Sequence, residues 1–132
     1  MKILIVEDDF ASRKLMQKFL EPFGECDIAV DGEEAIDAFE MALEEETPYD
    51  VIFLDIMMPR MDGQQALQSI REVEKEAGIK GKKEVKVIMT TVLEDPKNVM
   101  KAFHKGGATS YLVKPINRNM LIQEMKKLNL PI

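Results

Sequence analysis

Short apolar runs alternate with longer segments of helical periodicity along the whole chain. Alternation of apolar strands with amphipathic helices is the pattern of βαβ units, and it predicts an α/β fold with a parallel sheet. Strands that are covered on both faces are apolar at every position, and three runs have this character: Ile3–Val6, Val51–Leu54 and Val87–Met89. The five strands that we expect are Lys2–Val6, Cys26–Val30, Val51–Leu54, Val85–Met89 and Ser110–Val113.

Capping residues mark where the helices between these strands begin. Asp31, with Glu34 three positions later, is typical of a helix N-terminus. Asn117 is expected to cap the last helix. The pair Asp95-Pro96 predicts the start of a fourth helix, because proline is favoured in the first helical turn. The apolar stripes that define the five helices lie within Ala11–Leu20, Ala35–Ala42, Ala66–Ala77, Val99–Phe103 and Leu121–Leu128.

This order of elements predicts a flavodoxin-like (βα)5 doubly wound sheet with the strand order 2-1-3-4-5. Right-handed crossovers then place the carboxyl ends of the first and third strands side by side. Ligands of open α/β sheets bind at such a switch point. We therefore expect Glu7 and Asp8, which follow the first strand, to lie beside Asp55, which follows the third.

Composition and charge narrow the class of protein. With 132 residues, 45% of them apolar and 32% charged, the chain is expected to form one globular domain, residues 1–132, without a fused output domain. No apolar run approaches the roughly 20 residues of a membrane span, and the apolar run before Glu7 is too short for a signal peptide. A net charge of −6 disfavours nucleic acid as a partner. The single cysteine, Cys26, fits a reducing compartment, so we expect a cytoplasmic location.

The acids at the expected switch point indicate metal and phosphoryl chemistry. Three carboxylates within a few ångströms remain ionised only if a cation neutralises them. Oxygen ligands with room for water favour Mg²⁺, whereas one histidine and one cysteine leave almost no ligands for zinc. A carboxylate oxygen of Asp55 can attack phosphorus. Lys114, after the last strand, and a hydroxyl of Thr90 or Thr91 are placed to meet charge on the phosphoryl oxygens.

Four segments carry a resemblance to a known family. They are ILIVEDD (3–9), LDIMMPRMDG (54–63), VIMTT (87–91) and YLVKP (111–115), each ending an expected strand or following one. Through them the chain resembles, over essentially its whole length, the receiver domain of two-component response regulators, including the stand-alone chemotaxis type. The resemblance implies that Asp55 is the phosphorylated residue, and that Mg²⁺ is held by Asp8, Asp55 and the Met57 carbonyl with help from Glu7.

The resemblance also implies how the domain works. The chain is expected to take a phosphoryl group from a phosphohistidine on a sensor histidine kinase or a histidine phosphotransfer protein, and to lose it slowly by its own hydrolysis, without acting as a turnover enzyme. Lys114 is the implied lysine of the site, Thr91 the switch hydroxyl, with Thr90 a close alternative, and Tyr111 the rotating aromatic. The signal then passes through a switched surface to an unknown protein target, as a monomer or as a phosphorylation-dependent dimer.

Two apolar residues and two other classes of protein complete these expectations. Met57 lies two residues after Asp55 and Leu93 two after Thr91, and both are expected to overhang the phosphoryl group and hinder water. The alternative of a haloacid-dehalogenase-type Mg²⁺-dependent phosphatase calls for a second acid where Met57 stands. A flavodoxin-like flavin binder calls for a Gly/Ser/Thr-rich loop where the acids 7–9 stand.

Overall fold

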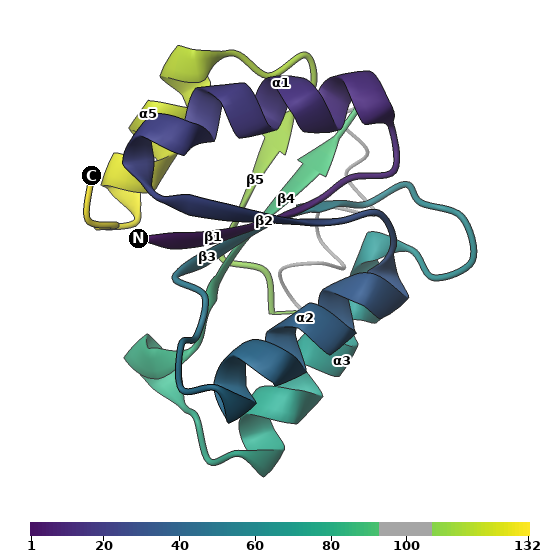
Figure 1. The fold of residues 1–132 in the computed structure, drawn as a ribbon, viewed down its shortest axis with the longest axis vertical. Coiled ribbons are helices and arrows are strands. Elements are labelled where there is room, and N and C mark those ends of the chain that lie inside the picture. Colours follow the sequence, from purple (N-terminus) through teal and green to yellow (C-terminus); the bar gives the residue numbers. More distant parts are fainter. Residues whose placement is uncertain (93–106) are drawn as a thin grey trace.

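A computed structural model describes residues 1–92 and 107–132 of the chain. In this part, five parallel strands form one sheet in the order β2-β1-β3-β4-β5, as predicted. The strands are β1 (Lys2–Val6), β2 (Glu25–Ala29), β3 (Val51–Asp55), β4 (Lys86–Thr91) and β5 (Ser110–Val113). The helices are α1 (Phe10–Leu20), α2 (Gly32–Glu44), α3 (Gly63–Glu76) and α5 (Arg118–Lys127). Helices α1 and α5 cover one face of the sheet, and α2 and α3 cover the other (Figure 1).

The helix N-termini are capped by side chains that the sequence makes recognisable. Asp31 accepts a hydrogen bond from the Glu34 backbone N–H, and Asn117 accepts one from the Met120 N–H, so both predicted caps are confirmed. Asp62 forms a capping box with Gln65 at the start of α3. The predicted fourth helix and Leu93 lie outside the described residues.

Side-chain alternation divides the core into two layers. Residues at successive strand positions face opposite sides of the sheet, so each strand contributes to both layers. The layer beneath α2 and α3 includes Leu4, Val6, Ile52, Leu54, Val87 and Met89. The layer beneath α1 and α5 includes Ile3, Ile5, Val51, Phe53, Ile88 and Leu112. The same alternation puts the residues two positions after Ile5, Phe53, Ile88 and Leu112 on the α1/α5 side, and these are Glu7, Asp55, Thr90 and Lys114.

Strand β4 is longer at its carboxyl end than the apolar pattern indicates. The predicted run ends at Met89, but the parallel ladder continues and pairs Asp55 with Thr90 and Thr91 with Val113. Both threonines are buried, and β-branched side chains suit a pleated strand even when they carry a hydroxyl. Two hydroxyl-bearing residues are therefore fixed by the sheet at the level of Asp55.

Gly63 brings the start of α3 against the end of β3. Its N–H donates to the Ile56 carbonyl at 2.9 Å. A Cβ atom on Gly63 would lie 2.1 Å from the Asp55 carbonyl oxygen, which is far inside van der Waals contact. The residue must therefore lack a side chain for the turn after Asp55 to close in this way.

An ion pair between Arg71 and the buried Glu74, which sequence patterns do not indicate, ties α3 to the segments that precede β4 and β5. Glu74 accepts from the Val85 N–H at 2.7 Å and from the Arg71 guanidinium at 2.6 Å. Arg71 also donates to the carbonyls of Val85 and Gly107. These contacts hold the chain in place before β4 and before β5, because a buried charge is stable only when it is paired and hydrogen-bonded.

Candidate functional site

Three carboxylates converge where β1 and β3 end. Glu7, Asp8 and Asp55 each offer one oxygen, and these oxygens lie within 4.8 Å of one another. Glu7 and Asp55 are 4% and 3% exposed, whereas Asp8 is exposed. The cluster thus has two ligands fixed by the sheet and one that faces solvent, which leaves an open side for water or substrate.

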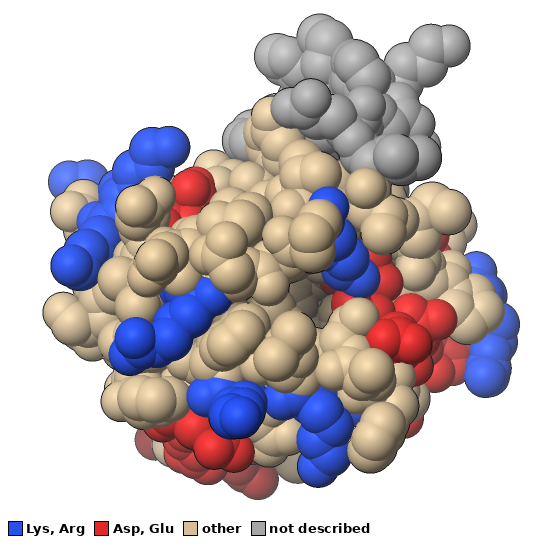
Figure 2. Space-filling view, turned by 90° about the horizontal axis from the view of Figure 1, so that it is seen from above, with Lys and Arg blue, Asp and Glu red and all other residues tan. Residues whose placement is uncertain are grey.

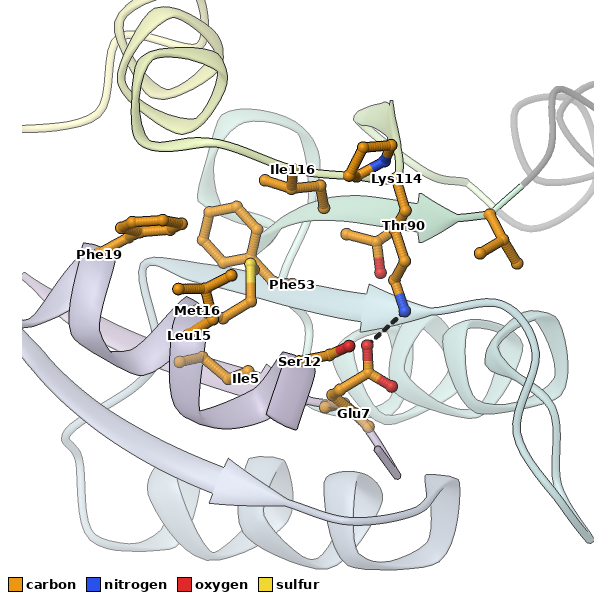
Figure 3. A pocket seen from close by; sticks show the side chains of 13 residues that line it. Ile5, Glu7, Ser12, Leu15, Met16, Phe19, Phe53, Thr90, Lys114 and Ile116 are labelled. Atoms are coloured by element: carbon orange, nitrogen blue, oxygen red, sulfur yellow. Dashed lines mark hydrogen bonds and ion pairs between the residues drawn. The ribbon is translucent and has the colours of Figure 1, made fainter. Parts of the chain in front are cut away.

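Lys114 reaches this cluster from the end of β5. Its Nζ forms an ion pair with the Glu7 carboxylate (Figure 3). The same Nζ lies 3.6 Å from Asp55 Oδ2. The backbone N–H of Lys114 donates to the Thr91 carbonyl at 2.6 Å, and the peptide bond from Lys114 to Pro115 is cis. The amine expected from the sequence therefore lies between two of the three acids.

The Asp55 carboxyl group has a perturbed acidity. Burial, followed by the hydrogen bond and negative charge of Glu7, raises the pKa of Asp55 to about 7, although Lys114 and the Met57 N–H oppose the shift. Burial also opposes ionisation of Glu7, yet its hydrogen bond to Lys114 leaves the Glu7 pKa below its ordinary value. A cation bound among these oxygens would favour the ionised form of Asp55. The donor set therefore fits Mg²⁺, which prefers carboxylate oxygens and keeps several waters.

The turn after β3 brings the main chain of Met57 to the Asp55 carboxylate. The Met57 N–H donates to Asp55 Oδ1 at 3.2 Å, while the Met57 side chain is 63% exposed. One oxygen of Asp55 is thus held by the main chain and the other faces Lys114. Metal ligation by the Met57 carbonyl stays a prediction.

The two threonines at the end of β4 face different sides of the sheet. Thr90 lies opposite Asp55 in the ladder and lines a cavity on the α1/α5 side, together with Glu7 and Lys114. Thr91 has the alternation of Met89 and faces the side on which Tyr111 packs against the α2/α3 core. Thr91 and Tyr111 therefore share a side of the sheet, as a coupled pair requires. The switch roles of both residues stay predictions.

The cavity beside the acids has a volume of about 450 Å³ (Figure 3). Its polar end carries Glu7, Lys114 and the hydroxyls of Ser12 and Thr90. Apolar side chains from α1, the sheet and the segment before α5 form the rest of the wall, including Leu15, Met16, Phe19, Phe53 and Ile116. Figure 2 looks onto the α1/α5 side of the molecule. Largely uncharged surface surrounds a hollow there, and acidic and basic atoms meet beside the hollow.

The fold and this set of groups define the class of protein. A model of the response regulator receiver domain matches residues 3–126, and the chain belongs to that family. The family resemblance and the α/β fold class expected from the sequence are both confirmed. The phosphatase alternative is not supported, because the match is to receivers and no second acid stands at Met57.

Three relatives illustrate the likeness. "Probable histidine kinase 2" of Oryza sativa subsp. indica is 34% identical over 133 residues, which covers 93% of this chain and 12% of that protein. A chain of the CheX-CheY complex of Borrelia burgdorferi with BeF3 and Mg is 28% identical, with a TM-score of 0.83 and coverage of 99% and 90%. A chain of the Saccharomyces cerevisiae complex of the phosphotransfer protein Ypd1 with the receiver domain of Ssk1 is 26% identical, with a TM-score of 0.82 and coverage of 97% and 88%.

Eight curated relatives are longer than this chain, which spans between 6% and 47% of their length. Within the described residues, no helix has the length and apolar character to cross a membrane.

Proposed function

We propose that this receiver domain accepts a phosphoryl group on the carboxylate of Asp55. The donor is a phosphohistidine on a sensor histidine kinase or a histidine phosphotransfer protein. The observation that carries the proposal is the meeting of Glu7, Asp8, Asp55 and the Lys114 amine at the ends of three strands. The yeast complex named above pairs a similar receiver with a phosphotransfer protein, which supports this class of donor.

Mg²⁺ would be held by Glu7, Asp8, Asp55 and the Met57 carbonyl, and when bound it supplies positive charge next to the phosphoryl oxygens. The Met57 N–H holds Oδ1 of Asp55, so Oδ2 on the Lys114 side is the oxygen best placed to attack. The new P–O bond forms as the P–N bond to the donor imidazole breaks. The imidazole nitrogen keeps the electron pair of that bond. Lys114 then contacts a phosphoryl oxygen, and this contact replaces its attraction to the Asp55 carboxylate.

The signal leaves the site by a shift between two conformations. The phosphoryl group attracts the Thr91 hydroxyl from the α2/α3 side of the sheet towards Asp55, and Tyr111, which lies on the α2/α3 side, turns into the space that Thr91 leaves. A phosphoryl group shifts this equilibrium only by the difference in its contacts with the two conformations. The domain is in this sense a phosphorylation-controlled switch that loses its phosphoryl group slowly by itself.

Exposed apolar side chains near the site support a protein as the phosphodonor. Within residues 1–92 and 107–132, few large apolar side chains are exposed, and several of them flank the acids or the cavity mouth: Phe10, Leu15, Met57 and Val92. Apolar groups that surround a polar reactive centre are typical of protein interfaces. A small phosphodonor such as acetyl phosphate would not need contacts with these exposed apolar side chains.

The proposal is tested by intact mass after incubation with phosphoramidate or acetyl phosphate and Mg²⁺. The wild-type chain is expected to gain one phosphoryl group, and Asp55→Asn none. Asp37→Asn is the matched control, because Asp37 is an exposed acid on α2, on the other face of the sheet from Asp55. An unmodified wild-type chain, or a label that persists in Asp55→Asn, would contradict the proposal.

A further inference from the structure

The guanidinium group of Arg13 contacts the main chain of the loop at residues 7–9, between β1 and α1, and it forms no ion pair with the carboxylates of that loop among the described residues. Arg13 is in the first turns of α1, and its Nη1 donates to the Glu7 carbonyl at 3.0 Å and to the Asp8 carbonyl at 3.3 Å. Among the described residues, the ion pairs of the structure do not include Arg13. Its positive charge is therefore directed at the main chain, and the carboxylate oxygens are left for other ligands.

The carbonyls that Arg13 binds belong to the residues that most need a fixed main chain. The chain leaves the ladder after the Glu7 N–H pairs with the Ala29 carbonyl, and α1 begins three residues later at Phe10. Asp9 is used as the cap of α1, where it accepts from the Ser12 N–H. Two of the three acids of the site, Glu7 and Asp8, thus lie in a short loop. Arg13 binds the backbone carbonyl of each.

The guanidinium is itself held in place from a second direction. Its Cζ lies 5.4 Å from the centroid of the Phe10 ring, within the range of a cation–π interaction. Lys14 lies over the same ring at 5.7 Å. Hydrogen bonds from a charged donor are stronger than neutral ones. One nitrogen of Arg13, Nη1, reaches both carbonyls while the guanidinium lies over the Phe10 ring. A lysine side chain is one bond shorter and has no planar group to stack on the ring.

We propose that Arg13 is a positioning residue of the metal site, which fixes the peptide groups of Glu7 and Asp8 so that both carboxylates face Asp55. The inference rests on the proposed function. It predicts a change in Mg²⁺ affinity of opposite sign to that of a simple charge effect. A nearby positive charge repels a dication, so removal of Arg13 would strengthen Mg²⁺ binding if charge alone mattered. If Arg13 positions the loop, removal weakens Mg²⁺ binding.

The test compares Arg13→Lys, Arg13→Gln and Lys14→Gln in the full chain. Mg²⁺ affinity is measured by calorimetry, and phosphorylation by acetyl phosphate is measured as a function of Mg²⁺ concentration. Both Arg13 variants are expected to bind Mg²⁺ about tenfold more weakly, as for other residues that orient metal ligands. Their phosphorylation rate is expected to recover at saturating Mg²⁺. Lys14→Gln removes a charge over the same ring but no carbonyl contact, and should bind Mg²⁺ at least as tightly as wild type.

A readout without metal separates loop order from binding. The Asp9 N–H donates to Glu7 Oε2 at 3.2 Å, so amide hydrogen exchange at Asp9 reports the order of this loop in the metal-free chain. We expect faster exchange in Arg13→Lys and unchanged exchange in Lys14→Gln. Wild-type affinity and exchange in Arg13→Lys, or tighter binding in Arg13→Gln, overturns the inference alone. A wild-type chain that neither binds Mg²⁺ nor accepts phosphoryl overturns the proposed function, and this inference with it.

Discussion

Replacing Asp55 with asparagine should stabilise the metal-free protein at neutral pH, although it removes the proposed phosphoryl acceptor. The pKa of Asp55 is raised from 3.8 to about 7 by burial and by Glu7. A shift of one pKa unit corresponds to about 1.4 kcal/mol, so the shift of about three units sets an upper limit of about 4 kcal/mol on the folding free energy that ionising this buried carboxyl costs above pH 7. An asparagine at this position carries no charge and avoids that cost.

The pH dependence of the difference follows from the direction of the shift. Below about pH 4 the carboxyl is protonated in both the folded and the unfolded chain, and the two variants differ little. As pH rises from 4 to about 7, the unfolded chain releases the proton and the folded wild type retains it, so the wild type loses stability relative to Asp55→Asn. Above pH 7 the difference is constant. The expected gain in Tm for Asp55→Asn is roughly 5–15 °C at pH 7.5.

The assay is thermal and urea unfolding in EDTA from pH 4.5 to pH 8, repeated with saturating Mg²⁺. Mg²⁺ should stabilise the wild type much more than Asp55→Asn, since a ligand stabilises the state that binds it. Asp37→Asn, at an exposed position, should show a flat difference across this range. An Asp55→Asn chain no more stable than wild type in EDTA at pH 7.5 would refute the reasoning about burial and the Glu7 charge.

Three further substitutions have expected outcomes. Met57→Asn should shorten the lifetime of the proposed aspartyl phosphate roughly tenfold, because it replaces an apolar side chain that we expect to hinder water. An unchanged decay rate would show that Met57 gives no shielding. Leu15→Arg should slow phosphoryl transfer from a phosphorylated partner protein but not from acetyl phosphate. Met41→Arg, at a residue of similar exposure on α2, should change neither transfer rate. Equal effects of the two substitutions would argue against docking of the partner on the exposed apolar residues around the site. Gly63→Ala should lower unfolding free energy by at least about 2 kcal/mol and impair phosphorylation, since its Cβ meets the Asp55 carbonyl; a stable, fully active variant would disprove that contact.

Local patterns were enough to predict the class of fold and the edge of the sheet where the site lies. Apolar runs that alternate with helical stripes indicate a parallel sheet, because each strand must be buried on both faces. The caps at Asp31 and Asn117 were predictable for a local reason too, since each side chain binds a backbone N–H three residues away. The strand order then placed Glu7 and Asp8 beside Asp55.

Contacts between distant segments were beyond such patterns. The sequence prediction ended β4 two residues too early, at Met89 and not at Thr91, because hydrophobicity stops at Met89 while pairing with Asp55 and Val113 continues the strand. The opposite faces of Thr90 and Thr91 depend on that register. The Arg71–Glu74 pair joins α3 to Val85 and thereby to β4. These residues are 11 to 14 positions apart in the sequence, so helix or strand periodicity does not predict their contact.

The sequence by itself therefore determined which carboxylates and which lysine gather, and at which edge of the sheet, because period and strand order are properties of the linear pattern. Only the tertiary structure decided the acidity of Asp55 and the anchoring of Glu7 and Asp8 by Arg13. Both depend on burial and on distances of a few ångströms between groups, and these quantities exist only once the strands and helices have packed together.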